Sequence, residues 1–143
     1  MELSNWIAGL MRLDYDALGF IPQPTIEYRY IKRSDYILQC DERGKAIGYL
    51  LHGPIRQGAP AHVVQHCIEL DKRNRGYGHL AISELIRRCS MIGASSIRLR
   101  CATDVPSIEF WKSAGFSVAH IEGGGKARHR QIAIMFLLLD LPL

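Results

Sequence analysis

The sequence has no long apolar run and no closely spaced pair of cysteines, and these absences exclude several classes of protein. Its longest uninterrupted apolar stretch, residues 132–139, holds eight residues, whereas a membrane-spanning helix needs about 20. The four cysteines lie far apart, none forms a CxxC pair, and no cluster of His, Cys and Asp has ligand spacing, so we expect no metal. The N-terminus lacks the pattern of a secretory signal, so we expect a cytoplasmic protein with reduced cysteines and no membrane association.

What is present is the composition of an ordinary globular protein. The chain has 143 residues, of which 48% are hydrophobic and 22% charged. We expect residues 1–143 to form a single domain that buries about two-thirds of its unfolded surface, as a monomer or a homodimer. Residues 1–70 carry 7 Lys and Arg against 8 Asp and Glu, and residues 71–143 carry 11 against 6, giving net charges of −1 and +5. The second half therefore favours an anionic partner, either a phosphate-bearing cofactor or a nucleic acid.

The apolar periodicity predicts both helices and strands. A first helix is expected over residues 4–18, with Ser4 as its cap and an apolar face of Trp6, Ile7, Leu10 and Met11. A second helix follows Gly78 and ends at Gly93, and a short third helix covers residues 106–115. Seven strands are expected, over residues 25–32, 36–40, 45–52, 62–70, 97–102, 116–121 and 131–139. This order predicts a mixed α/β (α+β) sheet of about seven strands with flanking helices.

A basic, glycine-containing segment lies between the strand at residues 62–70 and the helix that follows. It reads Arg73-Asn74-Arg75-Gly76-Tyr77-Gly78. Glycines let backbone amides approach a ligand closely, and a new helix adds free N–H groups and the positive end of its dipole, so the segment predicts a diphosphate-binding loop.

Two other interpretations also fit this segment. The glycines could simply shape a tight turn. A dinucleotide fold is the other, since residues 76–81 satisfy G-x-G-x-x-G/A and Asp104 follows the next strand. The dinucleotide fold is disfavoured because charged residues separate this motif from its strand and too little chain follows Asp104 for a parallel sheet.

Residues 62–116 resemble the GNAT superfamily of acetyl-CoA-dependent N-acetyltransferases. The family signature [RQ]-x-x-G-x-[GA] is met by residues 73–78, and a second block appears as Asp104-Val105-Pro106-Ser107, Phe110-Trp111 and Gly115-Phe116. The resemblance implies a mostly antiparallel, twisted sheet with a splay after its fourth strand, and acetyl-CoA or another acyl-CoA as cofactor. The pantetheine arm would pair with the backbone of Ile68 and Leu70, as an added strand does. The residues that the resemblance places at the cofactor are Ile68, Leu70, Arg73, Arg75, Gly76, Tyr77, Gly78, His79, Leu80, Ser107, Phe110 and Trp111.

The sequence departs from the family pattern at three points. Trp111 replaces the tyrosine that commonly acts as general acid, and indole cannot donate a proton to a leaving thiolate. Asp104 replaces an asparagine and brings a negative charge toward an anionic cofactor unless an arginine offsets it. The family has two helices between its first two strands, forming one wall of the acceptor pocket, and the short turn at Ser34-Asp35 leaves no room for them.

The expected activity is transfer of an acetyl group from acetyl-CoA to an amine of a small molecule or protein. This reaction needs a base that removes the ammonium proton, and Glu69 is the first candidate. An equally weighted interpretation makes Glu69 an edge carboxylate paired with Lys72 or Arg73. His66 is the second candidate, together with His62 on the same face of the strand, while Cys67 is expected in the core, with a covalent role as the alternative.

Two alternative functions are open at this stage. Trp111 suggests an acyl-CoA-binding module without efficient catalysis. The loop at residues 122–130 carries Lys126, Arg128 and Arg130 and suggests a GNAT-like enzyme that modifies nucleic acid. The same loop could equally be solvated, and it has no aromatic residue on which a base could stack.

Overall fold

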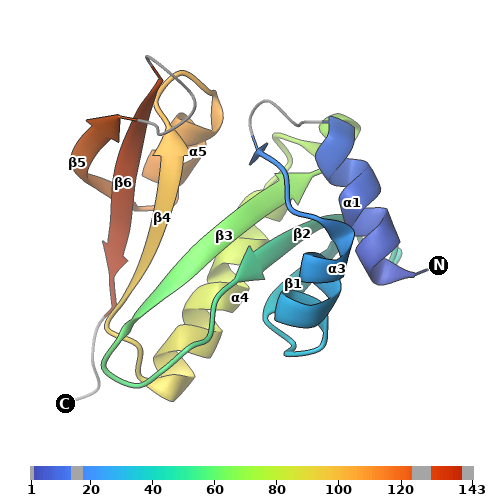
Figure 1. Ribbon diagram of the computed structural model, residues 1–143, viewed down its shortest axis with the longest axis horizontal. Helices are drawn as coiled ribbons and strands as arrows, with labels where there is room; N and C mark the ends of the chain where they lie inside the picture. The colour runs from blue at the N-terminus through green and yellow to red at the C-terminus, as the bar shows by residue number, and fades with distance from the viewer. Residues whose placement is uncertain (1, 14–17, 124–129, 140–143) are drawn as a thin grey trace. The chain divides into compact units, whose positions relative to one another are not determined.

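The structure is a computed structural model that describes residues 2–13, 18–123 and 130–139. The chain folds into two compact units, one formed by Met1–Pro54 with Val64–Leu85 and the other by Ile55–Val63 with Ile86–Leu143. The strands hydrogen-bond in the order β1-β2-β3-β4-β6-β5, a six-stranded mixed sheet. The predicted mixed α/β fold is therefore confirmed, with one strand fewer than expected (Figure 1).

The first unit begins with helices and continues into strands. Its elements are α1 (Leu3–Leu13), α3 (Gln23–Thr25), η1 (Ile26–Ile31), β1 (Tyr36–Cys40), β2 (Ala46–His52), the latter part of β3 (Pro60–Ile68), η2 (Leu70–Lys72) and the start of α4 (Tyr77–Ile92). Ile7 and Met11 of α1 pack with Ile26 of η1 and with Tyr49 and Leu51 of β2 in one hydrophobic core. The predicted apolar face of α1 is thus confirmed.

The sequence pattern predicted Ser4 as the cap of this helix, and the structure shows that Ser4 is not the cap. It lies inside α1, is fully buried, and its hydroxyl donates a hydrogen bond of 3.0 Å to Glu2 Oε1. The described part of the helix ends at Leu13, and residues 14–17 of the predicted helix lie outside the described residues.

The strand predicted over residues 25–32 is wrong, because this segment is helical. It forms the end of α3 and η1, in which backbone N–H groups bond carbonyls five residues back, as Lys32 does to Glu27 at 3.0 Å. A strand would place Ile26, Tyr28 and Tyr30 on one face, but Ile26 and Tyr30 are buried whereas Tyr28 is 65% exposed. Because Ile26 and Tyr30, four residues apart, are buried on one face, the burial pattern is that of a helix and not of a strand.

The helical segment at residues 25–32 also changes the number of helices that precede the sheet. Two helical segments, α1 and the continuous α3 and η1, precede the first strand in the structure. The expectation of a single early helix was therefore wrong, and the turn at Ser34-Asp35 joins η1 to β1 instead of joining two strands. The cause is that the tyrosine-rich, β-branched segment reads as a strand by composition and yields to packing against α1.

β1 and β2 form the predicted antiparallel hairpin, and an aspartate closes its turn. Tyr36 pairs with Leu51 at one end and Cys40 with Ala46 at the other. Asp41 Oδ1 accepts the backbone N–H groups of Arg43 and Lys45, both at 2.9 Å. These two hydrogen bonds, with the Lys45 amide contributing most, lower the pKa of Asp41.

β2 approaches the next strand closely at Gly48. A Cβ atom at this position would lie 2.7 Å from the carbonyl oxygen of Cys67 and would also clash with the side chain of Ile68. Glycine therefore allows the contact between β2 and β3 where β3 ends.

The second unit is built on a three-stranded antiparallel arrangement. β4 (Ser96–Ala102) pairs with β6 (Gln131–Leu138), which pairs with β5 (Ser117–Gly123), and α5 (Ser107–Ser113) connects β4 to β5. β4 also runs parallel to the first residues of β3, from Pro60↔Ser96 to His62↔Arg98. Among the described helices, none is long and apolar enough to cross a membrane.

Candidate functional site

The segment that joins β3 to α4 makes two left-handed backbone turns. Asn74 has a φ of 62° and Gly76 a φ of 87°, a region that glycine adopts freely and asparagine tolerates. A Cβ atom on Gly76 would meet no atom within 4 Å. Glycine is therefore needed at this position for its backbone conformation and not for space.

Gly76 is the residue from which α4 starts. Its carbonyl accepts the Leu80 N–H at 3.2 Å, so the amides of Tyr77, Gly78 and His79 come before the first hydrogen bond within the helix. The backbone amides of a first helical turn and the positive end of the helix dipole are suited to bind an anion. Arg75 is exposed and Lys72 half-buried on the same segment, and both add positive charge.

Arg73 ties the loop back to the end of β3. Its Nε donates a hydrogen bond of 2.8 Å to the Ile68 carbonyl, and Nη2 lies 3.9 Å from Cys67 Sγ. The sequence assigned Arg73 to pyrophosphate and the Ile68 backbone to pantetheine, and the two groups contact each other here. A carbonyl has a second lone pair and a guanidinium has further N–H groups, so each can also bind a ligand.

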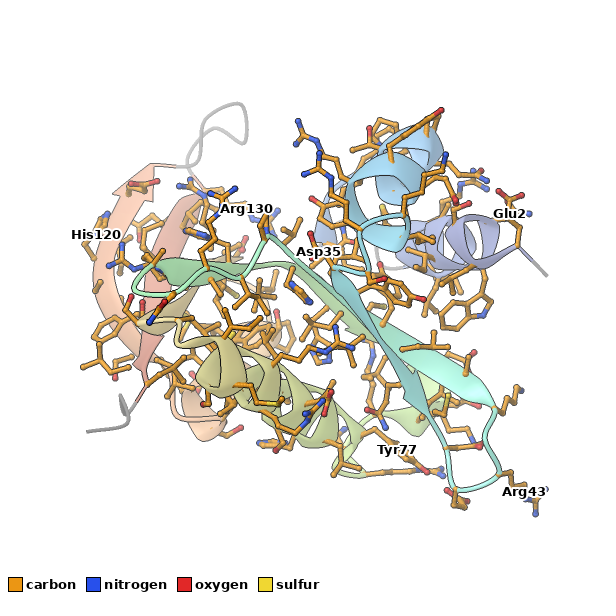
Figure 2. All side chains as sticks on the ribbon, turned by 90° about the horizontal axis from the view of Figure 1, so that it is seen from below. Glu2, Asp35, Arg43, Tyr77, His120 and Arg130 are labelled. Atoms are coloured by element: carbon orange, nitrogen blue, oxygen red, sulfur yellow. The ribbon has the colours of Figure 1, made fainter. Side chains whose placement is uncertain are left out.

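Tyr77 joins the start of α4 to the β1–β2 turn. Its hydroxyl donates a hydrogen bond of 2.5 Å to Glu42 Oε2, and Figure 2 shows Tyr77 directed toward the turn that carries Arg43. The bond raises the pKa of Tyr77 and lowers the pKa of Glu42. Sequence reasoning missed Glu42, because no local pattern connects it with a residue 35 positions away.

His66, the second predicted base, is half-buried on β3. Its Nε2 is buried. Burial, followed by the positive charges of Arg73 and His79, lowers the pKa of His66 to about 4. The ring is therefore neutral at pH 7 and is a weak base there. His62, at the other end of the same strand, is exposed.

Glu69, the first predicted base, lies at the end of β3. Its backbone N–H donates to the Ile47 carbonyl at 2.7 Å, and its own carbonyl accepts the Lys72 N–H at 2.9 Å. These bonds hold the main chain, while the side chain is half-buried.

In the second unit, Trp111 is part of the core. It is 6% exposed and packs edge-to-face on Phe110 and Phe116, with ring centroids 5.1 and 5.3 Å away. Such aromatic pairs add to the stabilisation that burial gives. The Ser107 hydroxyl lies 3.7 Å from Cys101 Sγ at the start of α5, and burial raises the pKa of that thiol.

An arginine offsets the charge of Asp104. Arg130 Nε lies 2.9 Å from Asp104 Oδ1. This arginine therefore offsets the negative charge that Asp104 introduces in place of the family's asparagine. Arg130 is one of the three cations proposed to contact nucleic acid, and it contacts Asp104. Lys126 and Arg128 lie outside the described residues.

Among the described residues, no three His, Cys, Asp or Glu side chains form a group that could hold a metal ion. The candidate site in the first unit thus consists of the loop before α4, Glu69 and the Glu42–Tyr77 link. The second unit, taken by itself, holds the α5 block with Asp104 and Arg130.

Comparison with known proteins gives one family and many similar folds. The model of the acetyltransferase (GNAT) family matches residues 4–116, and no curated protein matches the chain. Ard1 from Thermoplasma volcanium has a TM-score of 0.82 at 14% identity, covering 96% of this chain and 91% of its own.

Two further solved structures are similar. An aminoglycoside 6'-N-acetyltransferase complexed with coenzyme A has a TM-score of 0.79 at 11% identity, covering 99% of this chain and 93% of its own. The ribosomal-protein-S18-alanine N-acetyltransferase from Escherichia coli has a TM-score of 0.75 at 17% identity, covering 100% and 93%.

Proposed function

Because the chain belongs to the acetyltransferase (GNAT) family, we propose that it is an N-acetyltransferase that moves an acetyl group from acetyl-CoA to an amine. The observation that carries this proposal is the start of α4, where Gly76 turns left-handed and the amides of Tyr77, Gly78 and His79 lie in the first turn of the helix. This arrangement suits a diphosphate, which is the most strongly charged part of coenzyme A.

The proposed cofactor site follows from that loop. The amides of residues 76–80 would hold the pyrophosphate together with Arg73 and Arg75, and the backbone of Ile68 and Leu70 would pair with the pantetheine arm. Ser107, Phe110 and Trp111 would lie beside the arm or the thioester. Coenzyme A in the aminoglycoside acetyltransferase supports an acyl-CoA as the cofactor of a protein with this fold.

The proposed chemistry is direct transfer. The amine nitrogen attacks the thioester carbonyl, a C–N bond forms, the C–S bond breaks, and the coenzyme leaves as a thiolate that takes up a proton. The ammonium form must first lose a proton to a base. Glu69 is favoured over His66, because Glu69 lies at the end of β3 next to the proposed pantetheine site, whereas Nε2 of His66 is buried.

A second candidate function keeps the cofactor and lacks efficient transfer. Trp111 occupies the position of the family's acid, and its indole cannot donate a proton to sulfur. It is also buried among aromatic rings. A coenzyme A thiolate is a fairly good leaving group, so we favour the enzyme. The acceptor would be a small molecule or a protein, as the aminoglycoside and the S18 alanine of the two similar enzymes illustrate.

Calorimetric titration with acetyl-CoA tests the cofactor. We expect saturable binding to the wild type and none to Gly78→Glu, which places bulk and negative charge at the start of α4. Gly53→Glu is the matched control, because open space surrounds Gly53. Absence of binding by the wild type at millimolar acetyl-CoA would refute the proposal, and normal binding by Gly78→Glu would place the phosphates elsewhere.

Release of free coenzyme A during turnover of an amine panel separates the enzyme from the binding module. With an accepted amine, Glu69→Gln should lower kcat by about 10²–10⁴-fold and leave the affinity for acetyl-CoA unchanged. Rates equal to wild type would remove Glu69 as the base. Binding of acetyl-CoA without transfer to any amine would favour the module.

A further inference from the structure

η1 has one face in the core and another in solvent. Ile26 and Tyr30 are 0% and 8% exposed and pack in the same core as α1. The opposite face, which continues into the turn after η1, exposes four side chains: Tyr28, Arg29, Lys32 and Arg33. The side chains of Tyr28 and Lys32 are in contact, and Arg29 and Arg33 are their neighbours in the chain. We refer to these four residues as the η1 patch.

The η1 patch combines three positive charges with an aromatic ring. The Lys32 ammonium lies 4.4 Å from the centre of the Tyr28 ring, a cation–π contact that orders both side chains. Tyr28 is 65% exposed. The two acidic residues of this segment, Glu27 and Asp35, are half-buried, whereas the three cations are exposed. The solvent side of η1 is therefore positive.

The patch is fixed to the rest of the first unit at both ends of its turn. The Asp35 N–H donates to the Tyr30 carbonyl at 2.8 Å, and the Asp35 carbonyl accepts the His52 N–H at 3.0 Å. The first bond continues the winding of η1 and the second joins it to the end of β2. A surface held in this way loses little conformational entropy when it binds a partner.

We propose that the η1 patch docks an acidic segment of a polypeptide acceptor. This inference rests on the proposed function and specifies its substrate class. Tyrosine and arginine are the residue types that most often dominate protein–protein binding energy, and Tyr28, Arg29 and Arg33 supply them. Three clustered cations complement Asp and Glu side chains and raise the rate of encounter with them.

A single-stranded nucleic acid fits the patch less well. Such ligands are held by bases stacked on aromatic rings along a basic groove. In the η1 patch the Lys32 ammonium lies over the Tyr28 ring, so stacking on that side would first break the cation–π contact. An acidic peptide needs no such rearrangement, because its carboxylates can pair with the cations where they lie.

The test uses the intact chain and three probes. These are a fluorescently labelled hexaglutamate peptide, a hexaserine peptide of the same length and a single-stranded oligouridylate, with binding followed by anisotropy at low and high salt. One variant carries Arg29→Ala, Lys32→Ala and Arg33→Ala. Its control, which loses the same charge from exposed positions elsewhere, carries Arg43→Ala, Arg56→Ala and Arg98→Ala. Tyr28→Ala is a second test variant.

We expect hexaglutamate to bind, hexaserine not to bind, and salt to weaken the complex. The patch variant should bind hexaglutamate about fivefold or more weakly than the control variant, and Tyr28→Ala should also be weakened. Equal losses in the patch and control variants, or no binding of hexaglutamate by the wild type, would overturn the proposal. Binding of oligouridylate through the patch without hexaglutamate would overturn it as well.

Two further measurements keep the outcome unambiguous. Thermal unfolding followed by circular dichroism should be unchanged in the patch variant, because its substituted side chains are exposed. Acetyl-CoA titration of every variant separates the two proposals. If acetyl-CoA binds and hexaglutamate does not, the docking surface is wrong and the proposed function is retained. If acetyl-CoA does not bind the wild type, the proposed function itself fails.

Discussion

The Tyr77 hydroxyl donates a hydrogen bond of 2.5 Å to Glu42 Oε2. Tyr77 is the first residue of α4, and Glu42 lies in the turn between β1 and β2. The bond thus holds the helix start, where the proposed pyrophosphate site lies, against a hairpin turn that Asp41 closes through two backbone N–H groups. The hairpin thereby supports the proposed site without contributing a residue of the family signature.

Removing this bond should weaken cofactor binding without preventing folding. We expect Tyr77→Phe and Glu42→Gln each to raise the Kd for acetyl-CoA by about two- to tenfold, because the helix start loses a fixed contact. The double variant should be no weaker than the weaker single variant, since both changes remove one interaction. Additive losses in calorimetry would show that the two residues act separately. Arg43→Ala in the same turn is the control, and it should bind as the wild type does.

Alanine at Gly76 should destabilise the fold. The left-handed φ of 87° costs a residue with a Cβ atom about 1–2 kcal/mol, and no neighbouring atom is close enough to add a clash. Gly9→Ala is the matched control, because Gly9 lies inside α1 with open space around it. That change should stabilise the protein by about 0.5–1 kcal/mol. Urea unfolding of both variants measures the two effects. A change in the free energy of unfolding with the same sign in both variants would contradict the backbone argument.

His66 should make the stability depend on pH below neutrality. Its pKa is lowered from 6.5 to about 4 by burial, then by Arg73 and His79. Between these two values the unfolded chain binds a proton that the folded chain does not, so stability falls as the pH is lowered from 6.5 toward 4. The full loss corresponds to about 3 kcal/mol.

Urea unfolding of the wild type and His66→Asn at a series of pH values measures this contribution. The variant should be less stable at pH 7 and should lose less stability between pH 6.5 and pH 4. Parallel curves for the wild type and His66→Asn would show that another group titrates in this range.

Arg130 should matter mainly because it neutralises Asp104. The pair is partly exposed, with 25% of the Arg130 side chain and 63% of the Asp104 side chain accessible, so its contribution to stability should be about 0.2–1 kcal/mol. If the α5 block contacts the anionic cofactor, Arg130→Ala should weaken acetyl-CoA binding by leaving the Asp104 carboxylate uncompensated. Adding Asp104→Asn to that variant should restore the affinity. Failure of the second change to restore binding would mean that Arg130 contacts the cofactor itself.

Much of the fold was predictable because its patterns are local. The hairpin of β1 and β2, the helix after Gly78 and the strand at β4 follow from turn residues and from alternating or helical spacing of apolar side chains. The helix at residues 25–32 was not predictable, because β-branched and aromatic residues favour a strand by composition. Its helix depends on burying Ile26 and Tyr30 together against α1, which is a tertiary contact.

The candidate site divides in the same way. The loop from Arg73 to Gly78 could be located in the sequence, because an anion-binding helix start needs glycine and cations at fixed positions along one short segment. The side-chain pairs that hold the neighbouring parts of the site could not be located in this way. Glu42 meets Tyr77 across 35 positions, and Arg130 meets Asp104 across 26. No local pattern specifies such pairs.

The sequence by itself determined the family, through two motifs of consecutive residues whose spacing along the backbone does not depend on the rest of the chain. The tertiary structure decided three properties that the sequence left open or gave wrongly. It made the segment at residues 25–32 a helix with a basic, aromatic outer face, it buried Nε2 of His66, and it paired Asp104 with an arginine. Each depends on what lies next to a side chain in space, since burial and charge pairing are properties of neighbours and not of residue order.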